Sequence, residues 1–301
     1  MTRRDPYRSY YNFLAENVVT PFYYERLMYL RCRMSLSEVL GRKNPYLLKA
    51  KNIASADELV RSIVDAFLSS QEETMFGNRL EMFAIHVSSN LYGGFKSQLP
   101  SVDLEFERDG IYYVVGIKSG VNWGNNDQVH RMKDNFKAAK EFLHAQGVAK
   151  EVVAVNGCIY GKVAKPFKED ADAEKSYYKY AGQDFWHFIS GDDNLYREII
   201  KPIDEEARAR DEEFKRTYDG KVNGMVKEFS NLFLNDEGLI DWVKLIDYVS
   251  KRGKTDITFP KVKMAEDCAE YFHKKAEDRK RLREEKRKKE EMKRMISRKA
   301  G

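Results

Sequence analysis

Residues 102–118 read VDLEFERDGIYYVVGIK, and this stretch decides the fold class. Apolar residues alternate with charged or polar ones on both sides of Asp109-Gly110. Alternation of period two predicts β-strands with one buried face. An Asp-Gly pair tolerates the positive φ angles that a two-residue turn requires. The stretch therefore predicts a β-hairpin.

The two-residue turn also fixes the register of the predicted hairpin. It places Asp103 opposite Gly116, with Lys118 two residues farther along the same face. The residues of the other face are expected to be core: Val102, Leu104, Phe106, Tyr113, Val115 and Ile117. We therefore expect one face to be buried and the other to present Asp103, Glu105 and Lys118 together.

Two carboxylates and a lysine on one sheet face suit the hydrolysis of a phosphodiester. Carboxylates hold a divalent metal, which polarises a phosphoryl oxygen and lowers the pKa of a bound water. The lysine can orient that water or stabilise the charge that develops on the phosphate. A solvated face of an antiparallel hairpin carries the same residue types, so the hairpin alone leaves both interpretations open.

The segments around the hairpin predict an α/β fold. Residues 71–90 and 127–146 have apolar residues at helical spacing, and residues 151–160 form an apolar run typical of a buried strand. The order is helix, strand, strand, helix, strand. It predicts a mixed β-sheet flanked by helices, with further helical segments towards both ends of the chain.

Longer strings accompany the hairpin sequences SVDLEF and YYVVGIKSG: NPYLLKAKNI (44–53), SSQEETMFGNRLE (69–81), GIKSGVNWGNNDQ (116–128) and GQDFWHFISG (182–191). Together they resemble type II restriction endonucleases of the PD-(D/E)XK superfamily, the group that reads interrupted GC-rich palindromes. The resemblance covers roughly residues 40–200. It implies a restriction-endonuclease-like core and a Mg²⁺-dependent hydrolase of a restriction-modification system, which cuts double-stranded DNA as a homodimer.

The resemblance also implies roles for individual residues. Asp103 matches the first motif aspartate, a metal ligand, and Lys118 matches the lysine beside the attacked phosphate. Gly116 stands where the second motif acid is expected, and a glycine has no side chain to bind metal. It is expected to leave room for a side chain from elsewhere. The candidate replacements, in order, are Glu81 on the helix entering the core, Glu105 beside Asp103, and Asp127.

A loop rich in Gly and Asn follows the lysine-bearing strand and is the predicted site of DNA contact. The candidate residues there are Ser119, Asn122, Trp123, Asn125, Asn126 and Gln128, joined by Lys162 and Lys165 from a later basic segment. The alternatives are an ordinary connection with Asn126 or Asp127 as helix N-cap, and a basic surface loop.

The implied division of the chain has four parts: a helical N-terminal segment (1–70), a nuclease core with the DNA-contacting region (71–200), a helical segment (201–263) and a long charged helix (264–301). The last part lacks sustained apolar heptads. A solvated helix with non-specific attraction to phosphate is the expectation for it.

Composition limits the other possibilities. The net charge of the 301 residues is +5, but residues 271–301 hold fourteen Lys/Arg against six Asp/Glu, so the basicity belongs to the C-terminal segment. Cys32, Cys158 and Cys268 are far apart, so neither a disulfide nor a zinc site is expected. No apolar run has the length of a membrane span or a secretory signal, which predicts a cytoplasmic protein.

Three other functions stay open at this point. A structure-selective repair nuclease could share the same core. A catalytically impaired DNA-binding protein is suggested by Gly116. A helical scaffold organised by residues 264–301 is the third.

Overall fold

The computed structural model describes residues 6–260 and 266–299, with side chains for 8–260 and 266–296. The chain divides into two compact units. The first, here the sheet unit, consists of Met1–Val19, Phe76–Asp204 and Ala276–Gly301. The second, here the helical unit, consists of Thr20–Met75 and Glu205–Lys275. Helices α5 (Ala56–Tyr92), α9 (Ile200–Phe233) and α11 (Glu266–Lys299) each contribute residues to both units.

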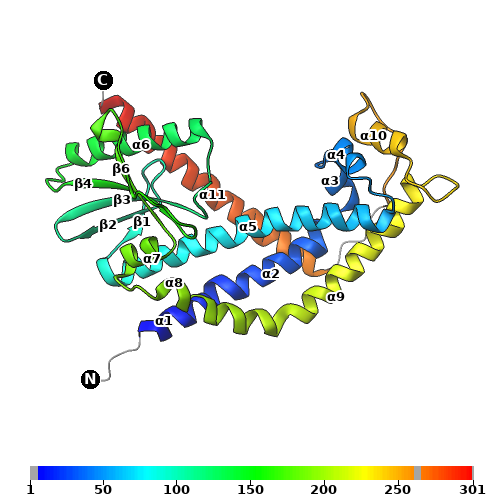
Figure 1. Ribbon diagram of the computed structural model, residues 1–301, viewed down its shortest axis with the longest axis horizontal. Coiled ribbons are helices and arrows are strands. Elements are labelled where there is room, and N and C mark those ends of the chain that lie inside the picture. Colours follow the sequence, from blue (N-terminus) through cyan, green and yellow to red (C-terminus); the bar gives the residue numbers. More distant parts are fainter. Residues whose placement is uncertain (1–5, 261–265, 300–301) are drawn as a thin grey trace. The chain divides into compact units, whose positions relative to one another are not determined.

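A six-stranded mixed sheet forms the centre of the sheet unit, with strand order β1-β2-β3-β4-β6-β5 (Figure 1). Its strands are β1 (Phe95–Lys96), β2 (Leu104–Arg108), β3 (Ile111–Lys118), β4 (Val152–Cys158), β5 (Phe167–Lys168) and β6 (Tyr177–Ala181). The pairs β3–β4 and β4–β6 are parallel, and the other neighbouring pairs are antiparallel. The predicted mixed sheet flanked by helices is confirmed.

The hairpin of β2 and β3 has the predicted register. Arg108 pairs with Ile111 and Glu105 with Val114. Asp109 and Gly110 form the turn with φ angles of 54° and 78°, the left-handed region that the Asp-Gly pair favours. Turn chemistry and alternation therefore sufficed to align these two strands.

Both faces of the hairpin are covered, which corrects the expectation of one open face. Helix α6 (Asn126–Ala145) covers one face, where Val114 and Phe136 belong to the same buried cluster (Figure 1). Val102 also belongs to this cluster and not to the predicted core face, because the pleat of β2 begins only at Leu104. Asp103 and Lys118, at the strand ends on this side, stay partly exposed.

The other face packs against helices α5 (Ala56–Tyr92) and α7 (Gln183–Ser190). The Phe106 ring lies 5.5 Å from the Tyr92 ring of α5 and 5.4 Å from the Phe188 ring of α7, centroid to centroid. The remaining elements of this unit are α1 (Pro6–Phe13), η1 (Leu14–Val19), η3 (Ala173–Lys175) and α8 (Leu195–Glu198). The sheet is thus a buried layer between helices.

The helical unit has its own apolar core, which includes Leu30, Val60 and Phe229. Its elements are α2 (Thr20–Met28), η2 (Tyr29–Arg33), α3 (Leu36–Leu40), α4 (Pro45–Ala50), α10 (Trp242–Ser250) and parts of α5, α9 (Ile200–Phe233) and α11 (Glu266–Lys299). Among the described residues, no helix combines the length and apolar character that crossing a membrane requires.

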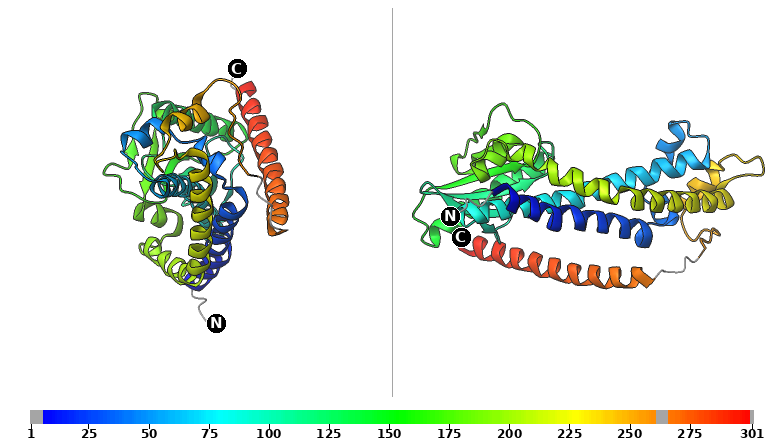
Figure 2. Two further views of the ribbon diagram at one scale, coloured as in Figure 1. Left: turned by 90° about the vertical axis from the view of Figure 1, so that its right-hand side faces the viewer. Right: turned by 90° about the horizontal axis from the view of Figure 1, so that it is seen from below.

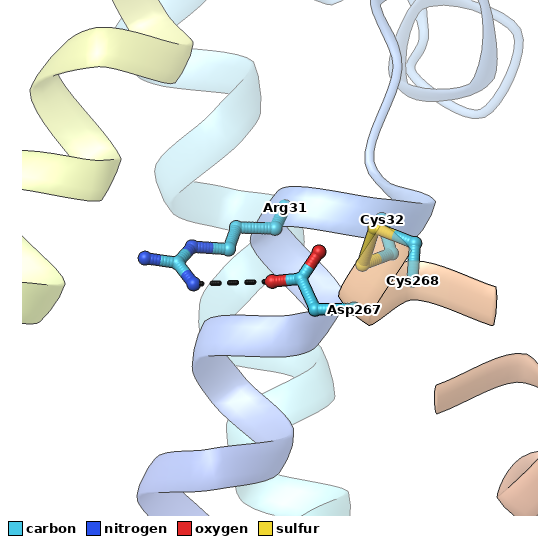
Figure 3. Close-up of a disulfide and its surroundings, with 4 residues drawn as sticks. All are labelled: Arg31, Cys32, Asp267 and Cys268. Carbon is cyan, nitrogen blue, oxygen red and sulfur yellow. Dashed lines mark hydrogen bonds and ion pairs between the residues drawn. A yellow bond between two sulfur atoms is a disulfide. The ribbon is translucent and has the colours of Figure 1, made fainter. Parts of the chain in front are cut away.

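Cys32 and Cys268 of the helical unit form a disulfide, which corrects the expectation that none is present (Figure 3). Their separation of 236 residues gave no sequence signal, because folding alone brings η2 and the start of α11 together. Beside the disulfide, Arg31 donates a hydrogen bond of 3.3 Å to the Asp267 carboxylate (Figure 3).

The C-terminal end of α11, drawn in red, lies beside the sheet in the views of Figures 1 and 2. Ile296 is 7% exposed and shares the α6-side cluster, and Met292 packs against that cluster. The expectation of a fully solvated helix is therefore wrong for this end of α11. Two apolar residues four positions apart were enough to dock it, although no heptad repeat is sustained.

Candidate active site

Asp103 and Lys118 lie together at the open end of the hairpin. The Lys118 Nζ atom is 3.6 Å from Asp103 Oδ2, and the two side chains are 30% and 16% exposed. The backbone N–H of Ile117 donates a hydrogen bond of 2.8 Å to the same carboxylate oxygen. The hairpin thus brings together the aspartate and the lysine, as its register predicts.

Helix α5 adds Glu81 to this pair. Its approach to β3 is close at Gly77, where a Cβ atom would lie 2.5 Å from the Ser119 hydroxyl. Burial and the charge of Asp103 raise the pKa of the half-buried Glu81 to about 7. The positive charge of Lys118 has the opposite effect and lowers that pKa. Glu81 is therefore near enough to both residues of the pair for their charges to shift its pKa.

Glu105, the second candidate acid, lies elsewhere. It is 5% exposed, and its carboxylate accepts a hydrogen bond of 2.9 Å from the Tyr112 hydroxyl. Burial and the Glu105 charge raise the pKa of Tyr112, so the phenol stays a donor. Glu105 is on the same face as Asp103, two residues farther along the chain, but its carboxylate is buried and bonded to Tyr112. Asp127, the third candidate, is exposed in the first turn of α6.

The space beside Gly116 is filled, contrary to the expectation that it leaves room for another side chain. A Cβ atom at Gly116 would lie 2.7 Å from the Ser101 carbonyl oxygen and 3.4 Å from the Phe136 ring. The glycine permits a close approach of backbone and aromatic ring. Glu81 approaches the site from α5 and does not occupy the space beside Gly116.

A second lysine at Asp103 comes from the far end of the sequence. Lys289 of α11 has its Nζ atom 3.9 Å from Asp103 Oδ1, and it donates a hydrogen bond of 3.1 Å to the Val102 carbonyl. Lys96 of β1 pairs with Glu285 at 3.4 Å and also lowers the pKa of Glu81. Sequence reasoning missed Lys289, since it is one of many lysines on a charged helix.

The loop after β3 is a capped connection whose side chains face solvent for the most part. Asn125 is the N-cap of α6 and forms a capping box with Gln128. The cap is one residue earlier than Asn126 and two earlier than Asp127, the predicted positions. Trp123 is half-buried, and the Lys118 ammonium lies 5.4 Å from its ring centroid. The exposed candidates for DNA contact are Ser119, Asn122, Asn125, Asn126, Gln128, Lys162 and Lys165.

The carboxylates of Asp103 and Glu81 fit a hard divalent cation. Mg²⁺ binds through one or two carboxylates and fills its other positions with water and substrate oxygens. Burial and then the Asp103 charge raise the pKa of Glu81, and a bound cation would relieve the repulsion between the two carboxylates. Elsewhere in the described chain, Cys32, Asp267 and Cys268 have metal-type spacing, but the two sulfur atoms are bonded to each other.

A comparison with protein families gives one match, and it covers Glu81, Asp103 and Lys118 of the candidate site. Residues 11–211 match the family model described as Type II restriction endonuclease EcoO109I. The match spans about two thirds of the chain and includes Glu81, Asp103 and Lys118, but it ends before α10 and α11. No individual curated protein matches the chain.

Proposed function

The chain belongs to the family of the type II restriction endonuclease EcoO109I, and from this premise we propose that it hydrolyses double-stranded DNA at a specific site with Mg²⁺. The observation that carries the proposal is the convergence of Asp103, Lys118 and Glu81 from three elements of the sheet unit. These are the groups that a metal-assisted phosphodiester hydrolysis requires.

In the proposed mechanism, Asp103 and Glu81 hold the metal. When bound, Mg²⁺ supplies charge stabilisation at the phosphoryl oxygens and a more acidic water. Lys118 places its ammonium beside the attacked phosphate, where it orients the nucleophilic water and offsets developing negative charge. The Ile117 N–H holds the Asp103 carboxylate in place through its 2.8 Å hydrogen bond.

The exposed side chains of the Ser119–Gln128 loop support the proposed DNA contacts. Within ten residues of Lys118, this segment carries Ser119, Asn122, Trp123, Asn125, Asn126 and Gln128. Lys162 and Lys165 are exposed and carry positive charge suited to phosphates. We propose that two copies of the chain act together, because a two-fold dimer matches the symmetry of a palindromic site.

Gly116 supports a second candidate function, that of a DNA-binding protein without cleavage activity. The second motif acid is missing at that position, and the Ser101 carbonyl and the Phe136 ring fill the space. This candidate requires DNA binding without cleavage at any Mg²⁺ concentration. A repair nuclease would instead cut according to DNA structure and not at one short sequence.

The test is a digest of unmethylated phage DNA by the purified chain with Mg²⁺, resolved on a gel. Discrete bands support the proposed function, and a smear favours a nuclease without sequence preference. Intact DNA under all metal conditions contradicts the proposal. In the same assay, Glu81→Ala should cut at least about tenfold more slowly, a barrier increase of about 1.4 kcal/mol. The Glu73→Ala variant, at an exposed position of the same helix, is the matched control.

A further inference from the structure

The Asp103 carboxylate lies between two ammonium groups. Lys118 Nζ is 3.6 Å from one carboxylate oxygen, and Lys289 Nζ is 3.9 Å from the other. Lys118 is part of β3, next to Asp103 in the hairpin. Lys289 is on α11 and reaches the carboxylate from a separate element. Both oxygens that a metal would use therefore already face a cation.

The position of Lys289 follows from a stripe of docking residues along α11. Glu285, Lys289, Met292 and Ile296 are spaced by three or four positions, so they lie on one face of the helix. Glu285 pairs with Lys96, while Met292 and Ile296 pack on the cluster under α6. The hydrogen bond from Lys289 to the Val102 carbonyl completes the stripe. Lys289 is thus held at Asp103 from both sides along the helix.

The Lys289 ammonium and a divalent ion cannot both sit at the Oδ1 atom of Asp103 without strong repulsion. An ammonium about 4 Å from a carboxylate occupies much of the volume that a divalent ion and its waters would need, and like charges at that range repel strongly in a partly buried site. Lys289 offsets the charge of Asp103 when no metal is bound. Removing its charge should therefore favour the metal.

Resting on the proposed function, we propose that Lys289 is a resident cation of the active site that competes with the divalent metal for Asp103. Metal binding displaces the Lys289 ammonium from the carboxylate. The Lys289 side chain is long and 30% exposed, so its ammonium can move into solvent while the helix stays docked. The family match ends before this helix, and the device is a property of the C-terminal segment.

Isothermal titration of the full chain with Mg²⁺ and with Ca²⁺, without DNA, tests this proposal. Lys289→Met keeps the aliphatic length and removes the charge. It should bind the metal about tenfold more tightly than the wild type, which corresponds to about 1.4 kcal/mol. Lys289→Arg keeps the charge and should retain the wild-type affinity. Lys288→Met, at the exposed neighbouring position, is the matched control and should also match the wild type.

An unchanged or weaker metal affinity of Lys289→Met overturns the proposal. So does a gain in affinity that survives the addition of Asp103→Asn, because the metal would then bind elsewhere. The proposed function is judged separately by DNA cleavage. If the wild type cuts DNA and Lys289→Met has wild-type metal affinity, only the competition is wrong. If Lys289→Met gains affinity and no variant cuts DNA, the nuclease proposal is wrong and the competition stands.

Discussion

Gly116 replaces the second acid of the family motif, and its tight surroundings predict that a larger side chain there destabilises the fold. A Cβ atom there would approach the Ser101 carbonyl to 2.7 Å, and that backbone atom cannot rotate away. Gly116→Ala should lower the free energy of unfolding by about 1–3 kcal/mol through overpacking. Gly220→Ala, in open space on α9, is the control and should not destabilise. Denaturant titration measures both, and equal stability of Gly116→Ala and wild type would contradict the packing described.

The raised pKa of Glu81 predicts how the stability of the fold depends on pH. Its pKa is raised in the folded chain from 4.5 to about 7, first by burial and then by the Asp103 charge, so the folded state binds the proton more tightly than the unfolded state. The resulting stability is present below about pH 4.5 and is lost as the pH rises to about 7. In EDTA, Glu81→Gln should therefore gain roughly 1–3 kcal/mol relative to wild type between pH 4.5 and pH 8. Stability curves that stay parallel over this range would contradict the assignment.

At this scale, the sequence sufficed to predict the pairing of Asp103 with Lys118, because period-two alternation and the Asp-Gly turn leave one register. It did not predict the burial of Glu105, which depends on the hydroxyl of Tyr112 and the cover of α6. It could not predict Lys289 at Asp103, since a contact across 186 positions depends on how a whole helix docks.

Among the elements, strong local patterns predicted the hairpin, α6 and β4. The strand β6 was missed, because the aromatic run Tyr177–Ala181 has no clean alternation and pairs on both edges within the sheet. The docking of α11 was missed because two apolar residues on a charged helix are a weak signal. Packing of the whole sheet unit, and not local preference, decides both cases.

The apolar contacts at the end of α11 are predicted to protect this helix from proteolysis. Met292→Ser together with Ile296→Ser removes its apolar contacts with the α6-side cluster. Trypsin should then cleave the basic C-terminal half of α11 faster than in wild type, because a released helix opens more often. Met295→Ser is the matched control, since that side chain is 48% exposed. Equal cleavage rates in the double variant and the control would show that these contacts do not hold the helix.

For the whole molecule, the proposed dimer has a consequence for cleavage. If each copy of the chain cuts one strand, mixed dimers of wild type and Lys118→Ala should cut only one. Supercoiled plasmid with one site should then accumulate as nicked circles in proportion to the mixed species. Double-strand cuts alone, at every mixing ratio, would contradict the assignment of one active site to each strand.

The nuclease activity of Asp103 and Lys118 is tested most directly by comparing DNA cleavage with DNA binding in Lys118→Ala. The duplex is the site recovered from the phage digest, and single-turnover cleavage and equilibrium binding are measured on the same preparation. Lys118→Ala should lose cleavage by about a thousandfold, the effect of removing a charge-stabilising group, while its DNA affinity stays within about threefold of wild type. Cleavage at the wild-type rate by Lys118→Ala would mean that Asp103 and Lys118 do not form the active site.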